Sequence, residues 1–344
     1  MTEVPGLDIE GLTDWLADTH PDLAHASLTA SVIAGGRSNL TYAVEGARVP
    51  LILRRPPLGH VLSSAHDMRR EHRVISALAG SAVPVPNVVD VVDDTAGQRI
   101  TGTVFFVMER APGEVLAHPA QNAGYSRAGL RHLGFELVEH LADLHAVDPR
   151  AVGLEDFGRP DGYLVRQLST WRRQLDASRS RDTPALDELQ SSLEHDVPVS
   201  ARAGIVHGDF RLDNALVVGS REDPRVSAIL DWEMATLGDP LVDLGIFALY
   251  WDIAALPGGP DVVASAVDPA AGYPSFDELV GVYADRAGIG IPDLSWFRAF
   301  AAYKLAVILE GINFRYRAGE TVGEGFDRMG ALVEPLARRG LEAR

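Results

Sequence analysis

The chain has no cysteine and almost no lysine. Without cysteine it can form no disulfide, thiolate zinc site, redox dithiol or cysteine nucleophile. Lys304 is the single lysine among 31 Lys and Arg residues, so a mechanism that needs a lysine has one candidate. The Walker-type Gly-Lys-Ser/Thr loop, His-Glu-x-x-His and Gly-x-Ser-x-Gly are also missing. Their absence argues against P-loop NTPases, zinc proteases and serine hydrolases.

Positive charge is scarce, with 31 basic against 48 acidic residues and a net charge of −17. This balance disfavours binding to a phosphate backbone, so we expect no nucleic-acid partner. No apolar run approaches the roughly 18 residues of a membrane span, and we expect no membrane partner. Residues 1–14 are acidic and lack a basic segment followed by an apolar run, which predicts a cytoplasmic protein. The sequence does not indicate an oligomeric state.

Hydrophobic periodicity predicts an α+β chain in two lobes. Residues 1–110 mostly alternate short β-like runs with turns, whereas residues 125–340 have mainly helical spacing. The turn-rich segment 109–113 separates the two patterns. We therefore predict an N-lobe over residues 1–110 and a C-lobe over residues 111–344.

The expected elements are short in the first part and long in the second. Strands are expected at 31–34, 40–45, 50–55, 88–92, 103–108, 215–218 and 226–230. Helices are expected at 65–79, 126–145, 239–251, 276–287, 294–317 and 325–339. The polar stretch 172–194 predicts one or two helices in a surface insertion, and the Gly/Pro-rich stretch 257–274 predicts a long loop.

The sharpest local pattern runs from His207 through Gly208-Asp209 to Asn214, with Asp231 following 17 residues later. Phosphoryl transfer needs a carboxylate to receive the hydroxyl proton and oxygen ligands for Mg²⁺. An Asp, an Asn five residues on and a second Asp supply that set. Taken singly, each could be an ordinary turn residue, but the joint spacing favours chemistry.

This pattern, with Asp231-Trp232-Glu233, resembles the catalytic and metal-binding loops of the aminoglycoside phosphotransferase and choline kinase superfamily. Leu53-Arg54-Arg55-Pro56-Pro57, His66-Asp67-Met68 and Arg70-Glu71 resemble its "phosphotransferase family" branch, which is similar to the kinase-like domain fused to some acyl-CoA dehydrogenases. The resemblance implies a two-lobed protein-kinase-like fold. Its N-lobe would be small and mostly antiparallel β with one key helix, and its C-lobe larger and mainly helical.

The resemblance also implies residue roles in the C-lobe. Asp209 would orient or deprotonate the acceptor hydroxyl, and Arg211 would neutralise developing charge. Asn214 and Asp231 would hold Mg²⁺. A solvated loop arginine is the alternative for Arg211. Asp243 is expected to brace the catalytic loop through backbone hydrogen bonds, and His207 to act as a structural hydrogen-bonding residue.

In the N-lobe the resemblance implies an ATP site. Backbone N–H groups of a glycine-rich loop would lie over the phosphates, Arg54 would replace the usual lysine with Glu71 as its partner, and the backbone after the last strand would bind adenine. The residues concerned are Gly35, Gly36, Arg37, Ser38, Asn39, Arg54, Glu71, Glu109 and Ala111. A plain Gly-Gly hairpin turn is the alternative for the loop.

The pairing of Arg54 with Glu71 also follows from spacing. Glu71 lies on the apolar stripe of the predicted helix together with Met68, Ile75 and Leu78. A buried carboxylate needs a cation, and Arg54 is the candidate. Pairing of Glu71 with a neighbouring arginine on its own helix is the alternative.

We therefore expect an ATP- and Mg²⁺-dependent kinase that phosphorylates a hydroxyl of a small molecule. The narrower resemblance favours a 4-hydroxyacyl-CoA or another hydroxylated metabolite, and the superfamily name suggests an aminoglycoside. Arg54 in place of lysine motivates the alternative, a non-catalytic nucleotide-binding pseudokinase module, and a protein kinase is a third possibility. Acceptor contacts could come from the late helices, at Tyr303, Lys304, Glu310, Asn313 and Arg317.

Overall fold

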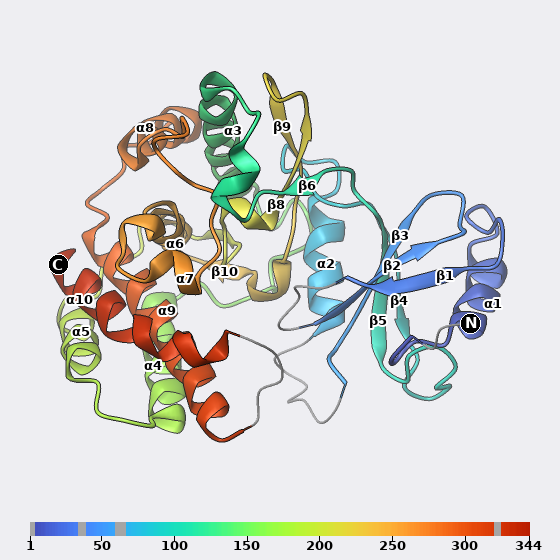
Figure 1. Cartoon of the computed structure of the whole chain (residues 1–344), viewed down its shortest axis with the longest axis horizontal. Helices are drawn as coiled ribbons and strands as arrows, with labels where there is room; N and C mark the ends of the chain where they lie inside the picture. The colour runs from blue at the N-terminus through green and yellow to red at the C-terminus, as the bar shows by residue number, and fades with distance from the viewer. Residues whose placement is uncertain (1–3, 34–38, 59–66, 320–324) are drawn as a thin grey trace. The chain divides into compact units, whose positions relative to one another are not determined.

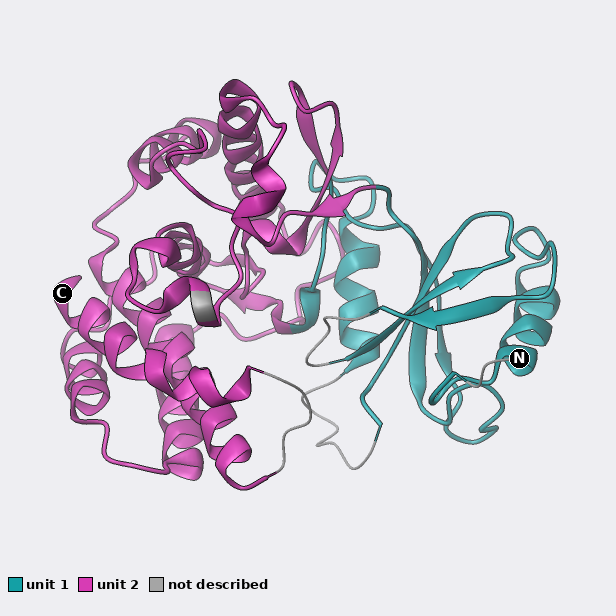
Figure 2. Cartoon of the chain, in the orientation of Figure 1, with its two compact units in different colours: residues 1–112, 227–233 teal, residues 113–226, 234–344 magenta. Residues whose placement is uncertain are grey.

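The computed structural model describes residues 4–33, 39–58, 67–319 and 325–344 (Figure 1). Its contacts divide the chain into two compact units, shown in Figure 2. The first unit comprises residues 1–112 and 227–233, and the second comprises residues 113–226 and 234–344. The segment 227–233, which we had assigned to the C-lobe, thus groups with the first unit. Whether residues 1–110 and 111–344 fold as separate domains stays a prediction.

The first unit is built on an antiparallel sheet with the order β1-β2-β3-β5-β4. Two helices, α1 (Ile9–Thr19) and α2 (Met68–Leu78), accompany it. The strands are β1 (Thr29–Val32), β2 (Leu40–Glu45), β3 (Leu51–Arg55), β4 (Val88–Asp93) and β5 (Val104–Glu109). The predicted strands of this part are confirmed to within a few residues, whereas α1 was missed.

Strand alternation gives this sheet two faces. Leu53 and Val107 belong to a core cluster that also contains Leu12 and Leu16 of α1. The intervening residues point to the other face, where Phe106 meets His72 of α2 edge-to-face. Arg54 alternates with Leu53 and so belongs to the α2 face, as the sequence predicts.

Helix α2 begins where its sequence provides a cap. The Asp67 side chain accepts hydrogen bonds from the backbone N–H groups of Arg69 and Arg70, both at 3.1 Å. The buried stripe of the helix contains Met68, Glu71, Val74, Ile75 and Leu78. The helix therefore carries a carboxylate on its apolar face, as predicted.

The second unit is mainly helical, and α9 (Ser295–Arg317) packs against four of its helices. These are α4 (Tyr163–Ser178), α5 (Pro184–His195), α6 (Leu241–Trp251) and α10 (Val333–Glu342), and a separate pair is formed by α3 (Arg127–Ala146) and α8 (Phe276–Ala287). Within the described ranges, no helix is both long and apolar enough to cross a membrane. The predicted α+β class is confirmed.

The remaining strands form two small sheets. Strand β6 (Glu114–Val115) pairs with β8 (Ala215–Gly219), which neighbours β9 (Pro224–Ile229), and β7 (Gly204–Val206) pairs with β10 (Thr236–Gly238). Strands β6, β7 and β10 were not predicted, because two or three residues show no periodicity. The expected loop 257–274 contains a short helix, α7 (Gly259–Val262). The expected helix 325–339 is a 3₁₀ segment followed by α10.

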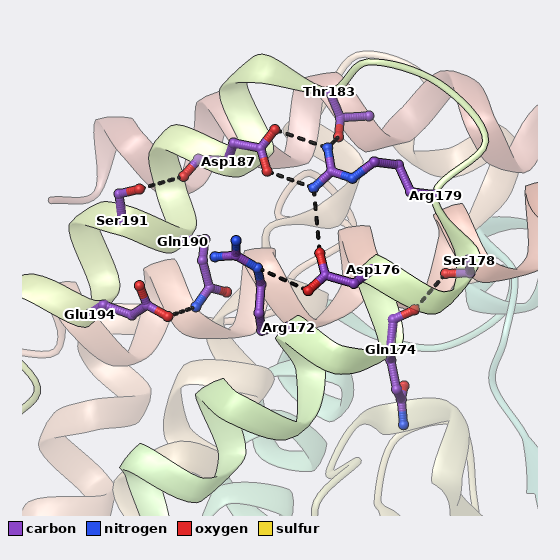
Figure 3. Close-up of polar contacts among 10 residues, drawn as sticks. All are labelled: Arg172, Gln174, Asp176, Ser178, Arg179, Thr183, Asp187, Gln190, Ser191 and Glu194. Carbon is purple, nitrogen blue, oxygen red and sulfur yellow. Dashed lines mark hydrogen bonds and ion pairs between the residues drawn. The ribbon is translucent and has the colours of Figure 1, made fainter.

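The expectation of a surface insertion at 172–194 is wrong. Helix α4 begins nine residues earlier, at Tyr163, and both α4 and α5 pack against α9. Figure 3 shows polar contacts along these two helices, including the Arg179–Asp187 pair at 2.6 Å. Each helix also has a buried side, with Trp171 and Leu189 in the core. The ion pairs made the stretch read as polar, although each helix is amphipathic.

A glycine in α6 sets how closely α6 and α9 approach. A Cβ on Gly245 would lie 2.3 Å from the carbonyl oxygen of Phe297, whereas a Cβ on Gly281 of α8 would meet nothing within 4 Å. Gly245→Ala should lower the free energy of unfolding by about 1–3 kcal/mol. Gly281→Ala should raise it by about 0.5–1 kcal/mol, because alanine loses less backbone entropy in a helix. Urea unfolding measures both, and a stabilising Gly245→Ala would contradict the tight contact.

Candidate active site

The predicted catalytic loop leaves β7 and reaches β8 through a 3₁₀ turn at Leu212–Asn214. Gly208 has a φ of +86°, and a Cβ there would lie 2.8 Å from the carbonyl oxygen of Met234. Only glycine accepts this conformation and approach at low cost. The side chain of Asp209, which follows, is 22% exposed. The loop therefore combines a tightly packed backbone with an accessible carboxylate.

Asp243, in the first turn of α6, holds this backbone through hydrogen bonds. Its buried carboxylate accepts hydrogen bonds from the N–H groups of His207 at 2.7 Å and Gly208 at 2.8 Å. It also lies 3.2 Å from Nε2 of buried His145. Burial acts to raise the pKa of Asp243, but these hydrogen bonds and the two histidines outweigh it and lower the pKa. The bracing role predicted for Asp243 is confirmed.

His207 is fully buried. Its Nδ1 lies 3.2 Å from the backbone nitrogen of Asp209, which donates to it. Its ring meets Phe210 edge-to-face. These contacts are those of a structural hydrogen-bonding residue, as the sequence predicted.

Asp209 is oriented by two neighbours in its own loop. Nδ2 of Asn214 donates to the Asp209 carbonyl oxygen at 2.8 Å and to its Oδ2 at 3.0 Å. Nε of Arg211 lies 3.5 Å from the same Oδ2, and the Arg211 guanidinium stacks over the ring of Tyr250 at 4.5 Å. Arg211 also pairs with Asp213 at 2.9 Å. With 22% of its side chain exposed, Arg211 is not a freely solvated loop arginine.

Tyr250 of α6 is a residue that sequence reasoning missed. Burial raises the pKa of Tyr250, and the negative charge of Asp209 adds to the shift. The phenol therefore stays protonated, and its ring lies against the Arg211 guanidinium. In the sequence it belongs to the apolar run of α6, where an aromatic residue is typical of a core position, so no local signal identified it.

The first unit contains a second charged cluster. Nη1 of Arg54 contacts Oε1 of Glu71, and Nη2 of Arg54 lies 3.4 Å from Oδ1 of Asp231. The Glu71 side chain is 1% exposed and that of Arg54 is 13% exposed. Burial raises the pKa of Glu71 to about 7, against the opposing charge of Arg54. The predicted pairing of Arg54 with Glu71 is confirmed, and Asp231 is a further partner.

Asp231 has an unusual backbone. Its φ is +64°, and Gln98 is the one other non-glycine residue of the described ranges with a positive φ. Such conformations cost of order 1–3 kcal/mol and cluster at functional sites. The Asp231 side chain is 36% exposed. Two residues on, the Glu233 carboxylate accepts a hydrogen bond from Nδ2 of buried Asn39 at 2.9 Å.

The other residues that were predicted to bind the nucleotide fall into two groups. Gly35, Gly36, Arg37 and Ser38 lie outside the described residues. Glu109 ends β5, where its N–H donates to the Asn87 carbonyl at 2.8 Å and its carboxylate accepts from the Asn87 amide at 3.0 Å. This N–H is therefore used within the first unit, and Ala111 lies two residues further along the chain.

Several residues of α9 were candidates for contacting the molecule that accepts the phosphate. Most of them make their contacts inside the second unit. Tyr303 and Glu310 are fully buried. Glu310 accepts hydrogen bonds from Ser180 at 2.8 Å and Arg181 at 2.9 Å. Asn313 donates to Ser180 at 3.4 Å. These groups tie α9 to the α4–α5 connection.

The proposed metal ligands have the chemistry that Mg²⁺ requires. Asp231 supplies a partly exposed carboxylate, and both hydrogen bonds of Asn214 to Asp209 use its amide nitrogen, so neither occupies the amide oxygen. Mg²⁺ prefers such oxygen ligands and takes few of them from protein when phosphates and water complete the shell. Each of the two residues thus offers an oxygen ligand of the kind that suits the ion.

Comparison with known proteins gives a consistent result. Residues 29–279 match the family model described as "Phosphotransferase enzyme family". Acyl-CoA dehydrogenase family member 11 of Gallus gallus is 34% identical over 328 residues, which are 94% of this chain and 41% of that protein. The chain thus spans about two fifths of the length of the curated relatives it matches.

Solved structures are also similar. A Ralstonia eutropha protein, provisionally described as an aminoglycoside phosphotransferase, is 32% identical, with a TM-score of 0.82 and coverage of 98% of both chains. The GDP and kanamycin complex of an aminoglycoside 2″-phosphotransferase has a TM-score of 0.61 at 17% identity, covering 96% of this chain and 98% of that one. The kinase-like fold that the resemblance implied is confirmed.

Arg54→Met tests the buried pair of the first unit. Glu71 would lose its cation, and the free energy of unfolding at pH 8 should fall by about 3–5 kcal/mol. Because the pKa of Glu71 lies at about 7 in the folded state and ordinarily at 4.5, the folded state binds the extra proton. The stability that this proton binding adds is complete below pH 4.5, and it is lost as the pH rises through the pKa of the folded state. The penalty should therefore be smaller at pH 5 than at pH 8.

Urea unfolding at the two pH values measures this difference. The control is the double variant Arg54→Met/Glu71→Gln, which lacks both charges and should lose most of the pH dependence. Equal penalties for Arg54→Met at pH 5 and pH 8 would show that Glu71 does not respond to the loss of Arg54.

Proposed function

The chain belongs to the phosphotransferase enzyme family, and from this premise we propose that it transfers the γ-phosphoryl group of ATP to a hydroxyl of a small molecule. The observation that carries the proposal is the arrangement around Asp209. Its carboxylate is partly exposed, yet the backbone before it is held by Asp243 and its side chain by Asn214. A fixed, accessible carboxylate is what orienting or deprotonating an attacking hydroxyl requires.

In this proposal Asp209 and its two neighbours Arg211 and Tyr250 each have one task. Asp209 receives the hydroxyl proton as the oxygen attacks the γ-phosphorus, and the bond to the departing ADP breaks. Arg211, stacked on Tyr250, offers a positive charge where negative charge develops. Tyr250 holds the Arg211 guanidinium against its ring and so keeps this charge in place.

Residues of the first unit complete the proposal. Arg54, fixed by Glu71, binds nucleotide phosphate in place of the lysine common in kinases, since its guanidinium keeps the charge and can bind phosphate bidentately. Asp231 and Asn214 hold Mg²⁺, which when bound neutralises phosphate charge. Backbone groups at Glu109 and Ala111 are proposed to bind adenine, and the glycine-rich segment 35–39 to cover the phosphates.

For the acceptor we propose a hydroxylated acyl thioester such as a 4-hydroxyacyl-CoA. Support comes from the relatives named acyl-CoA dehydrogenase family members, in which a region matching this chain belongs to a longer protein. An aminoglycoside is the second candidate, because a similar structure contains kanamycin. We also propose that the protein is cytoplasmic.

Asp209→Asn should slow transfer strongly while leaving nucleotide binding intact. Without the carboxylate the hydroxyl loses its proton acceptor, and the rate should fall by about 10²- to 10⁴-fold. The measurement is transfer of labelled γ-phosphate from ATP or GTP to 4-hydroxyacyl-CoA thioesters, free hydroxy acids, aminoglycosides, choline and macrolides. Asp223→Asn, at an exposed carboxylate, is the matched control.

The outcomes separate the hypotheses. Transfer at the wild-type rate in Asp209→Asn would refute the catalytic role of Asp209. A wild-type protein that binds Mg·ATP and transfers to no acceptor would support the nucleotide-sensing module instead. Label on generic protein acceptors would support a protein kinase.

Asp231→Asn tests the metal site. Asparagine tolerates a positive φ almost as well as aspartate, so the backbone should be kept while the charged ligand is lost. The Mg²⁺ concentration for half-maximal transfer should rise by about 10-fold or more. A Mg²⁺ titration of the transfer rate measures the shift, and an unchanged half-maximal concentration would remove Asp231 from the metal site.

A further inference from the structure

Lys304 is the single lysine of the chain, and its side chain is buried in the middle of α9 with 8% exposed. Lysine is almost never fully buried unless it has a specific partner. Every other cationic side chain of the Lys/Arg class is arginine. The contacts of this one lysine therefore decide what an ammonium does at this position.

The contacts of Lys304 converge on the catalytic loop. Its Nζ donates a hydrogen bond to the carbonyl oxygen of Gly208 at 2.6 Å. The same atom lies 3.8 Å from Sδ of Met234 and 5.4 Å from the centre of the Trp171 ring. A carbonyl, a thioether and a ring face are all electron-rich and uncharged. The ammonium is thus held by one strong acceptor and two weak ones.

Both backbone polar groups of Gly208 are consequently held by side chains. Its N–H donates to Asp243 of α6, and its C=O accepts from Lys304 of α9. Its positive φ and its close approach to Met234 leave it little room to move. Gly208 immediately precedes Asp209. The Asp243 and Lys304 side chains therefore fix the direction in which the Asp209 carboxylate leaves the backbone.

Charge complements this geometry. Burial lowers the pKa of Lys304, and the negative charges of Asp209 and Asp243 oppose that shift. The same two carboxylates are the ones that brace or perform the proposed chemistry. The two carboxylates therefore offset part of the cost that burial imposes on an ammonium here.

We propose that Lys304 is a positioning residue of the phosphotransfer reaction. Its ammonium holds the Gly208 carbonyl and so aims the Asp209 carboxylate at the acceptor hydroxyl. This role rests on the proposed function. Arginine could not replace it, because a planar group with five donors would leave most of them unsatisfied beside one carbonyl.

Lys304→Met tests the role, because methionine keeps an unbranched stem and removes the donor. Misplacing a catalytic group by about 1 Å costs about 100-fold in rate, so kcat should fall by that order, with the KM for ATP and acceptor little changed. Arg298→Met is the matched control. Arg298 is a cation of the same helix, but it pairs with Asp252 and not with the loop. This substitution should leave kcat unchanged. Thermal unfolding of both variants confirms that they are folded.

A chemical rescue separates charge from packing and also covers the case in which Lys304→Met does not fold. Because the chain has no cysteine, Lys304→Cys introduces the sole thiol, which can be alkylated in urea before refolding. Alkylation with 2-bromoethylamine restores an ammonium on a stem of the same length, and 1-bromopropane gives the neutral counterpart. The aminoethylated protein should recover most of kcat, and the propylated one should not.

Two failures are distinguishable. If wild-type protein transfers phosphate and Lys304→Met or the propylated protein matches its kcat, the positioning role is refuted and the proposed function stands. If wild-type protein transfers to no acceptor, the proposed function itself falls, and the role of Lys304 falls with it.

Discussion

The buried carboxylate of Asp243 is the interaction on which the catalytic loop depends. It accepts hydrogen bonds from two consecutive backbone N–H groups, at His207 and Gly208, at the point where β7 ends. A carboxylate buried without partners would cost several kcal/mol, so Asp243 and the loop stabilise each other. His145 and Tyr283 extend the network, with Nδ1 of His145 lying 2.7 Å from the Tyr283 hydroxyl. The loop is thereby tied to α3, α6 and α8.

The same principle recurs in the first unit. Glu71 lies on the apolar face of α2, where only a cation makes its burial tolerable, and Arg54 on β3 is that cation. Arg54 is consequently directed toward Asp231 as well. In each unit a buried charge on a helix fixes the orientation of a second charged or polar group. Hydrophobic packing supplies the helices and the sheet, and these buried charges select one orientation for the polar groups that they contact.

Lys304 and Tyr250 show how helices of the second unit act on the loop from outside it. Lys304 donates to the carbonyl before Asp209, and the ring of Tyr250 packs against the guanidinium of Arg211. Neither belongs to the motif, and each is separated from Asp209 by many residues. The position of Asp209 is therefore a property of the helical packing around α9 and α6 as much as of its own loop. Substitutions such as Gly245→Ala, which disturb that packing, are relevant to function for this reason.

The sequence by itself determined the α+β class, the strands of the first sheet, most of the long helices, the spacing of Asp209, Asn214 and Asp231, and the pairing of Arg54 with Glu71. These features are local, because periodicity, turn residues and a carboxylate on an apolar stripe are visible within a few turns of chain. Only the tertiary structure decided the rest. Strands β6, β7 and β10 exist because their partners are present, and α4 and α5 belong to the core because α9 covers their apolar sides. The roles of Lys304 and Tyr250 depend on contacts between residues far apart in the chain, and a burial partner of that kind leaves no trace in local spacing.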